Sequence, residues 1–594
     1  MKTRTTGNKP LAGTFRWLLA GAVFLAIQGC GGGGSDSSDP SDFDAPVDPV
    51  NIGGSADLYA PDRLLEVDIQ MSAGDFAQLR AEARTLASTD RECTPEFDYT
   101  EFTARVTIDG ESMDDVIVRK KGYMGSLSPS IPSLKLDFND LKKGRTYQNS
   151  SRMTLNNNRQ DPSNARQCLA YDQFRAAGIA APRCNYARVT VNGESLGVFT
   201  NVEPIKKPFL RRAFGNDEGN QYEAQTADFG TWLNRRFEKK TNEKENDRSD
   251  LQAVADALAL PDEQMMNVLP QLVDVEEFIR FWAVETLLGA WDSATGNANN
   301  FHLYRNPEDG LFHFIPWGAD TAFRGDHPLK PLTGVFYRNF RLAERLFAIP
   351  EYRSEYDQAL EELLATQWDE VALTERLAAI SELTGTGEGA TASLRYFILG
   401  KGEPGQSDYQ PARREVLEQA MAADATSGTV SLLADQEPDC SAPATTALTG
   451  TISSRDGNDR GAFNFTLPGG RDVSASLTLA AFGADSLVTS VDRESKPAVV
   501  SLLMIGVDAA DRYKPYVLQV FIESSDYVPG THDFHGFATN ALLFEVDESL
   551  PGDVRTLALG ATGQISLSSV GTGGDAGDVS LSLDATLEYV AQQP

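Results

Sequence analysis

The sequence predicts an α+β fold in which a two-lobed domain precedes a C-terminal antiparallel β-sandwich. Alternating apolar and polar residues over 102–108 and 133–138 predict strands, and a helical period over 275–288 predicts a long helix. After residue 446 the apolar residues fall only in short alternating runs separated by Gly and Asp, which is typical of an all-β unit. Mixed elements followed by strands alone indicate two folded units.

The first 30 residues indicate export. Basic residues precede the apolar run 17–27, which is too short to span a bilayer and leads through small residues to Cys30. Residues 27–30 read Ile-Gln-Gly-Cys and look like a bacterial lipobox, in which the cysteine is lipidated and becomes the new N-terminus. We therefore expect a lipoprotein signal peptide at 1–29 and an anchor on Cys30 that attaches the protein to the bacterial cell envelope, at the outer membrane or the cell surface. The alternative is an ordinary signal peptide with an incidental cysteine.

Composition sets the remaining domain boundaries. Residues 30–55 are rich in Gly, Ser, Asp and Pro and have few apolar side chains, so we expect a flexible tether there. The large domain is expected at 56–424. A Ser/Thr/Ala/Pro-rich linker follows at 425–445, and the β-sandwich occupies 446–594.

The charge excludes one class of partner. The chain has 53 Lys and Arg against 85 Asp and Glu, a net charge of -32. Binding to a phosphate polyanion requires clustered cations, so nucleic acid is excluded as a partner.

Four cysteines remain after Cys30, and an exported compartment permits disulfides. An even number allows two bridges, but four cysteines allow three pairings and the sequence does not choose among them. They are Cys93, Cys168, Cys184 and Cys440.

The stretch 291–323 carries the predicted chemistry. It places Asp292 in a Gly/Asn loop, enters an apolar strand after Asn300, and returns on a second strand that leads to Asp320. Protein-kinase-type phosphotransferases use one Asp to orient the acceptor hydroxyl, and an Asn and a second Asp to hold metal. We expect Asp292 to be catalytic and the other two to bind Mg²⁺ or Mn²⁺. Asn297, at the kinase spacing from Asp292, is the alternative amide ligand, and turn capping is the structural alternative for both aspartates.

The order of elements before this stretch matches a kinase N-terminal lobe. A strand with Lys135 is followed by a helix starting near Ser163, a hairpin across Asn192-Gly193, and a connector that begins at Glu203. In kinases the strand lysine binds the phosphates of ATP, and the connector meets the adenine. Lys135 is equally expected as a solvated strand lysine, and Glu203 as a strand-end charge.

These segments together resemble a known family over about residues 62–400. The sequence is identified as a member of the CotH (spore coat protein H) kinase-like proteins, an atypical branch of the protein-kinase-like fold. The matching parts are the strand end and loop at 119–122, SLKLDF at 133–138, the block 155–214, the Asp292 loop with Asn299-Asn300, and IPWGAD at 315–320.

The resemblance implies a role for each site residue. Asp292 would be the catalytic Asp, and Asp320 and Asn300 the metal ligands. Lys135 would contact the nucleotide phosphates, and Arg119 with Gly122 would shape the loop above them. The implied activity is Mg²⁺/ATP-dependent phosphoryl transfer to a protein or small hydroxyl acceptor outside the cytoplasm. The alternatives are a non-catalytic surface lipoprotein acting as an adhesin or binding module, and a metal-dependent hydrolase.

The sequence departs from the family pattern in two places. Family members often have Trp-Asp-x-Asp where this chain has Gly318 and Ala319 before Asp320, so one carboxylate is missing. The helix near Ser163 has no Glu to form the usual Lys–Glu ion pair. Asp161 and Asp172 are the nearest substitutes.

Overall fold

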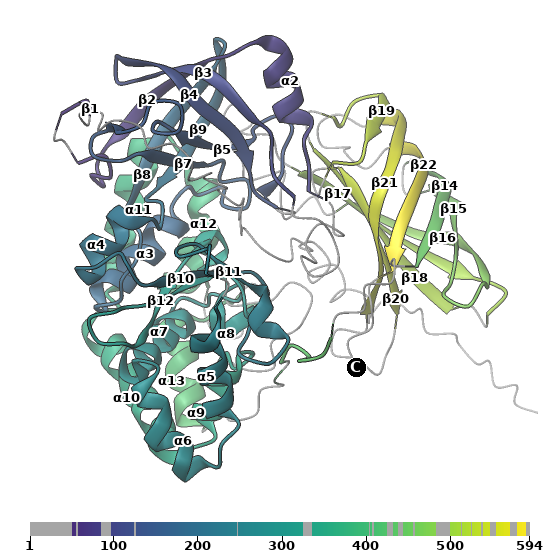
Figure 1. The fold of residues 1–594 in the computed structure, drawn as a ribbon. Helices are drawn as coiled ribbons and strands as arrows, with labels where there is room; N and C mark the ends of the chain where they lie inside the picture. Colours follow the sequence, from purple (N-terminus) through teal and green to yellow (C-terminus); the bar gives the residue numbers. More distant parts are fainter. Residues whose placement is uncertain are drawn as a thin grey trace, which may run out of the picture.

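The predicted α+β composition is confirmed, with a mixed N-terminal part and a β-rich C-terminal part (Figure 1). The predicted signal peptide, the predicted lipidation site at Cys30, and Cys93 and Cys440 lie outside the described residues. Among the helices that are described, none is both long enough and apolar enough to cross a bilayer. The computed structural model describes residues 50–54, 57–84, 97–123, 126–245, 247–324, 335–402, 404, 406, 409–423, 430, 432–437, 444–455, 458–482, 499–511, 514–523, 526–535, 539–546, 554–570 and 579–589.

Seven strands of the N-terminal part form a closed barrel in the order β2-β3-β4-β5-β7-β9-β8. Their inward side chains, such as Val67, Val118 and Phe199, are fully or almost fully buried. The hairpin predicted at Asn192-Gly193 joins β8 to β9, and both residues have the positive φ that this tight turn needs. The strands are β2 (Leu64–Gln70), β3 (Glu101–Ile108), β4 (Glu111–Lys121), β5 (Ser133–Asp137), β7 (Arg152–Asn156), β8 (Cys184–Val191) and β9 (Glu194–Val202).

Helix α2 (Ala73–Ala81) follows β2 and buries Phe76 and Leu79. The short strand β1 (Val50–Ile52) pairs in parallel with β6 (Arg145–Tyr147). The end of the predicted tether is therefore part of the fold, because its backbone hydrogen-bonds with the barrel domain.

Helix α3 (Arg166–Ala176) connects β7 to β8 and lies between the barrel and the helical part. A disulfide joins Cys168, in this helix, to Cys184, the first residue of β8. This is one of the pairings that the sequence left open.

The next part combines a four-stranded sheet, ordered β11-β10-β12-β13, with a group of helices. Helix α7 begins after Asp274, whose side chain accepts a hydrogen bond from Glu277 N and so caps the first turn. It buries Phe278 and Trp282, and Trp282 stacks on Tyr356 of α10 with ring centroids 3.9 Å apart. The strands are β10 (Asn220–Ala224), β11 (Phe237–Lys239), β12 (Phe301–Arg305) and β13 (Phe312–Pro316); the helices are α4 (Lys207–Phe214), α5 (Ser249–Leu258), α6 (Asp262–Val268), α7 (Val275–Leu287), α8 (Ala294–Asn297), α9 (Arg341–Phe347), α10 (Pro350–Thr366), α11 (Glu370–Thr384), α12 (Glu388–Leu399) and α13 (Arg413–Ala422), with 3₁₀ turns η4 (Leu233–Arg236), η5 (Leu269–Gln271) and η6 (Ala319–Thr321).

The expected C-terminal sandwich is corrected by the pairing of its strands. One continuous antiparallel sheet runs β19-β21-β20-β18-β17-β16-β15-β14-β22, and β21 also pairs with β22, so that eight strands close into a ring with β19 on the outside. Alternation fixes which face of a strand is buried but not its partner, and bulges in β21 add the curvature that closure needs. The strands are β14 (Thr445–Arg455), β15 (Asn458–Thr466), β16 (Asp472–Phe482), β17 (Val499–Asp508), β18 (Lys514–Glu523), β19 (Gly530–Asp533), β20 (Asn540–Val546), β21 (Val554–Val570) and β22 (Val579–Tyr589).

Part of the predicted linker is held by the helical part. Asp435 accepts hydrogen bonds from the backbone N–H groups of Thr231, Trp232 and Leu233, at 2.8 to 3.2 Å. The Arg341 guanidinium also donates to Leu433 O at 2.7 Å. The chain is thus fixed at this point before it enters the C-terminal β unit.

Candidate functional site

The loop that carries Asp292 is built on a buried carboxylate. Glu285, near the end of α7, accepts hydrogen bonds from Ala294 N at 3.1 Å and from Thr295 N at 2.8 Å and Thr295 Oγ1 at 2.5 Å. Its burial raises the pKa of Glu285 to about 7. Because these bonds cap α8, the loop leaves α7 in one fixed direction.

Three amide side chains orient the Asp292 carboxylate. Asp292 Oδ1 accepts from Asn297 Nδ2 at 3.2 Å and from Asn299 Nδ2 at 3.0 Å, while Oδ2 accepts from Asn300 Nδ2 at 2.9 Å. The Asp292 side chain is buried, with 5% exposure. Both amides weighed from the sequence, Asn297 and Asn300, therefore contact Asp292, each on a different carboxylate oxygen.

The amide oxygen of Asn300, Oδ1, lies beside Gly318 in the turn that follows β13. The φ of Asn300, 56°, is in the left-handed region, which Asn tolerates better than most residues. The Oδ1 atom is buried and has no hydrogen-bond partner among the described residues. A Cβ on Gly318 would lie 2.7 Å from this oxygen, and Gly318 also has a positive φ of 53°. The backbone conformation at 318 and the position of Asn300 therefore favour glycine there.

Asp320 lies in η6, just beyond β13, and is buried. Phe301 pairs with Pro316 at this end of the β12–β13 hairpin, and Trp317 N donates to Asn300 O at 3.0 Å. Asn300 and the turn with Asp320 are therefore neighbours, as expected from strand order. The backbone just after Asp320 is held by Arg166 of α3, whose Nη1 donates to Ala322 O at 2.6 Å and Phe323 O at 2.8 Å.

Arg119 and Lys135 lie in a pocket between the barrel and the β10–β13 sheet. They are cross-strand partners on β4 and β5 and so share one face of the barrel wall. The pocket has a volume of about 60 Å³. It is lined by Glu101, Ile117, Arg119, Lys135, Leu136, Asp137, Arg152, Met153 and Thr154 from the barrel, by Pro204, Ile205 and Lys206 from the connector, and by Glu223, Lys240, His302 and Trp317 from the second part.

Gly122 begins the loop between β4 and β5. Its φ is 108°, and a Cβ there would lie 2.4 Å from Ser126 Oγ, so the turn requires glycine. Tyr99 Oη donates to Gly122 O at 2.7 Å. The prediction that Gly122 shapes a tight loop beside Arg119 matches this local geometry, while its role above a nucleotide remains a prediction.

Glu203 is bound by two arginines at the start of the connector. Its oxygens accept from Arg183 Nη2 at 2.8 Å and from Arg212 Nη2 at 2.7 Å, with further bonds from Nε of each arginine at 3.2 Å. Glu203 is 5% exposed and borders a second cavity of about 320 Å³, which shares Arg152, Pro204 and Lys206 with the first pocket. This places Glu203 as a brace of the connector, and its predicted contact with the nucleotide remains a prediction.

A link between the barrel and α3 was missed in the sequence. Lys121 Nζ donates to Asn156 Oδ1, and Asn156 Nδ2 donates to Gln167 Oε1 at 2.7 Å. In kinases a Lys–Glu ion pair joins a strand to the helix. Here two amide side chains, those of Asn156 and Gln167, join Lys121 of β4 to α3. The signal was present, because Lys121 lies two residues after Arg119 and therefore on the same face of β4.

The two aspartates considered as substitutes for the missing Glu have other partners. Asp161 accepts from Arg166 N at 2.8 Å and from Ser163 N at 3.1 Å, at the start of α3. Asp172 pairs with Arg175 and Arg376.

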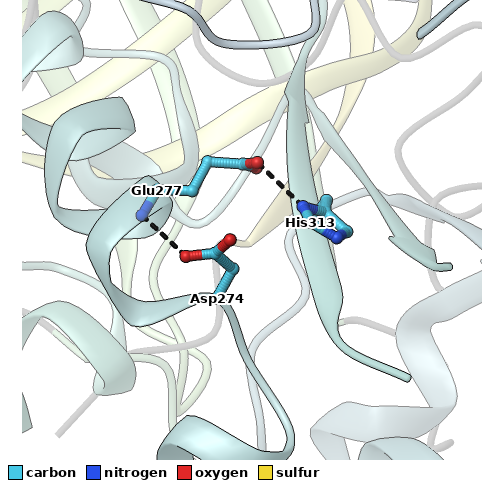
Figure 2. Close-up of side chains that lie close together, drawn as sticks. All are labelled: Asp274, Glu277 and His313. Carbon is cyan, nitrogen blue, oxygen red and sulfur yellow. Dashed lines mark hydrogen bonds and ion pairs between the residues drawn. The ribbon is translucent and has the colours of Figure 1, made fainter. Parts of the chain in front are cut away.

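A second polar cluster lies at the opposite end of the β12–β13 hairpin (Figure 2). His313 Nδ1 lies 2.8 Å from Glu277 Oε2, and His313 Nε2 lies 3.0 Å from Asp309 Oδ2. Burial alone would lower the pKa of His313, but the hydrogen bonds and charges of these two carboxylates raise it to about 9. Ligand atoms of Asp274, Glu277 and His313 lie within 4.8 Å of one another, yet a cation there would have to displace the bond between His313 and Glu277.

The fold and this site define an α+β protein with a buried cluster of carboxylates and amides at the ends of two adjacent strands. Residues 118–400 of the chain match the family described as CotH kinase protein. This match covers the barrel from β4 onward, α3 and the β12–β13 hairpin.

Two relatives have similar sequences. The chain is 28% identical over 237 residues to the inner spore coat protein H of Bacillus subtilis (strain 168), which covers 37% of this chain and 64% of that protein. It is 25% identical over 270 residues to the invasin CotH2 of Rhizopus delemar, which covers 40% of this chain and 44% of that protein. The chain thus spans less than two thirds of the length of either relative.

Proposed function

We propose that this protein is an atypical CotH-family kinase that transfers a phosphoryl group from ATP to a hydroxyl acceptor. The observation that carries the proposal is the Asp292 carboxylate, which three amide groups hold beside a buried acceptor oxygen of Asn300. Amide donors orient a carboxylate through hydrogen bonds, as a general base requires.

The residues present fit a divalent cation. Asn300 Oδ1 is a buried oxygen that no other described group satisfies, and Asp320 adds a carboxylate in the adjoining turn. An all-oxygen donor set is what Mg²⁺ and Mn²⁺ prefer. Asp320 and Asn300 would hold the cation, which when bound neutralises charge on the transferring phosphoryl group.

The remaining steps belong to the side chains of the chain itself. Asp292 accepts the proton of the acceptor hydroxyl, and its amide partners keep the carboxylate aimed in one direction. Arg119 and Lys135 supply positive charge from the barrel wall for the phosphates, and the connector at Pro204 to Lys206 borders the same pocket. The pocket of about 60 Å³ is smaller than a nucleotide, so binding requires the two parts to separate about the connector.

We further propose that the protein acts outside the cytoplasm, attached to the cell envelope through Cys30. The support is the lipobox-like sequence at 27–30 together with relatives named as a spore coat protein and an invasin. Its acceptor is then a surface protein or a small exported hydroxyl compound.

The second candidate function is a non-catalytic surface protein that binds through its C-terminal β unit. It is favoured by the small pocket and by the relative named as an invasin.

The deciding experiment is phosphoryl transfer from labelled ATP by residues 31–594 with Mg²⁺ or Mn²⁺. Asp292→Ala should lower incorporation by roughly 10²-fold or more, because general-base contributions are of that size. Asp256→Ala, at an exposed carboxylate on α5, is the matched control and should leave incorporation unchanged. Equal incorporation by wild type and Asp292→Ala would refute the kinase proposal and leave the surface-binding function.

A further inference from the structure

The loop between β4 and β5 is covered by a part of the chain about 400 residues further on. Leu127 and Ser128 are fully buried, and Ser126 and Ile131 are almost so. On the barrel side, Asn157 Nδ2 donates to Ser126 O at 2.9 Å and to Ile131 O at 2.7 Å. The C-terminal β unit adds two further contacts, one to Ser128 and one to Lys120 just before the loop.

The first contact is a buried hydrogen bond to the end of β18. Ser128 Oγ donates to Glu523 Oε1 at 2.6 Å, and Glu523 is fully buried. Burial raises the pKa of Glu523, and the nearby charge of Arg159 opposes that rise. Both Ser128 and Arg159 belong to the barrel domain, so groups of that domain bond Oε1 of Glu523 and offset its charge, while Oε2 has no hydrogen-bond partner among the described residues.

The second contact joins Lys120 to His535. Lys120 Nζ lies 3.2 Å from His535 Nε2 and also donates to Arg80 O at 2.7 Å and Glu82 O at 2.5 Å. Burial lowers the pKa of Lys120 to about 7, and burial together with Lys120 and Arg159 lowers the pKa of His535 to about 3. A neutral imidazole is therefore the acceptor for the lysine.

Contacts between buried ionisable groups add little net free energy to an interface. Each group loses its hydration when the interface forms, and this cost offsets the energy of the pairing. The contacts therefore fix the geometry of docking more than they strengthen it. Figure 1 shows the C-terminal β unit beside the N-terminal barrel, as the two contacts require. The unit is therefore placed to act on the β4–β5 loop.

We propose that the C-terminal β unit is an intramolecular clamp on the β4–β5 loop, held by the Ser128–Glu523 and Lys120–His535 contacts, and that its release activates the protein. The activating effect rests on the proposed function, because Arg119 lines the pocket proposed for the nucleotide and the loop held by the C-terminal β unit begins shortly after it, at Gly122. The docking itself does not depend on any activity.

The test compares Glu523→Lys and His535→Ala with wild type in residues 31–594. Hydrogen–deuterium exchange should rise roughly tenfold or more at 126–131 in both variants, because local opening exposes these amides. Exchange in β14 and β22, which pair with each other in the same β unit, should not change and reports that the unit remains folded. Asp584→Lys, a charge reversal at an exposed position on β22, is the matched control and should match wild type.

Labelled-phosphate incorporation is measured on the same samples. A severalfold rise in Glu523→Lys and His535→Ala, together with the increased exchange, supports the clamp and its inhibitory direction. Unchanged exchange at 126–131 overturns the clamp, whatever the activity. Increased exchange with equal or lower incorporation overturns the inhibitory direction alone. Increased exchange with no incorporation by any sample, wild type included, supports the clamp and refutes the proposed function.

Discussion

The two ends of the β12–β13 hairpin hold carboxylates in opposite ways. At the end marked by the Phe301–Pro316 pair, Asp292 is bonded by three neutral amides. At the end marked by His313, the carboxylates of Glu277 and Asp309 lie against a histidine whose pKa they raise to about 9. Amide donors orient a carboxylate, whereas a protonated histidine forms an ion pair with it. We therefore propose that the first end serves the chemistry and the second end the stability of the fold.

The largest expected effect is at Asp320. Asp320→Asn removes the carboxylate proposed to hold the cation, so phosphoryl transfer should fall by roughly 10²-fold or more and the metal concentration for half-maximal rate should rise. Incorporation measured across a Mg²⁺ titration checks both. Asp309→Asn, the same change at the opposite hairpin end, should leave the metal dependence as in wild type. If both variants behave alike, the two ends do not differ in function.

Gly318→Ala should disturb the site through shape alone. The added Cβ would lie 2.7 Å from Asn300 Oδ1, at a φ of 53°, so we expect a loss of about 2 kcal/mol or more in the free energy of unfolding. Denaturant unfolding measures this loss. Gly310→Ala is the matched control, because Gly310 also has a positive φ but its Cβ would meet open space; its cost should be about 1 kcal/mol. Equal losses in the two variants would show that Asn300 does not restrict position 318.

Asn299→Ala should have a smaller effect on activity. It removes one of two donors to Asp292 Oδ1 and an acceptor for Thr226 N, while the Asn297 donor remains. We expect the rate of transfer to fall by roughly tenfold, about the value of one hydrogen bond to a charged group. Steady-state rates provide the measurement. Asn306→Ala, which removes an amide bonded to Asp309, should change the rate little, and a comparable loss there would contradict the assignment.

The smallest expected effect is the pH dependence of the stability that His313 contributes at the other end of the β12–β13 hairpin. The pKa of His313, about 9 in the folded protein, lies above the value of about 6.5 for an unfolded histidine. Its ion pairs therefore stabilise the fold fully below about pH 6.5, and this contribution is lost as the pH rises through about 9. The melting temperature of His313→Gln should be a few degrees below wild type at pH 6, and the gap should close by pH 10. A constant gap would show that the charge of His313 is unimportant.

Much of the local structure was predictable because its signals are local. The Asn192-Gly193 turn, the cap at Asp274 and the helical period after it specify β8–β9 and α7 without reference to the rest of the chain. The neighbouring positions of Asn300 and the Asp320 turn follow from an antiparallel hairpin, whose two outer ends must meet.

The remainder depends on contacts between distant segments. Closure of the C-terminal sheet rests on the pairing of β21 with β22 and on bulges that no alternating pattern reveals. The hydrogen bonds from Lys121 to Asn156 and from Asn156 to Gln167 join three elements through amide side chains. The resemblance to kinases instead led us to expect a carboxylate as the partner of the lysine. The brace on Glu203 needs arginines 20 residues before it and 9 after it, which become neighbours only in the folded chain.

The Cys168–Cys184 bridge has a practical consequence for anyone producing this protein. It closes a loop between residues 16 apart and ties the helix that carries Arg166 and Gln167 to the first residue of β8. A covalent link of this span contributes about 3 kcal/mol by restricting the unfolded chain. Material made in a reducing cytosol would lack it, so recombinant chain is best secreted into an oxidising compartment before any assay is judged.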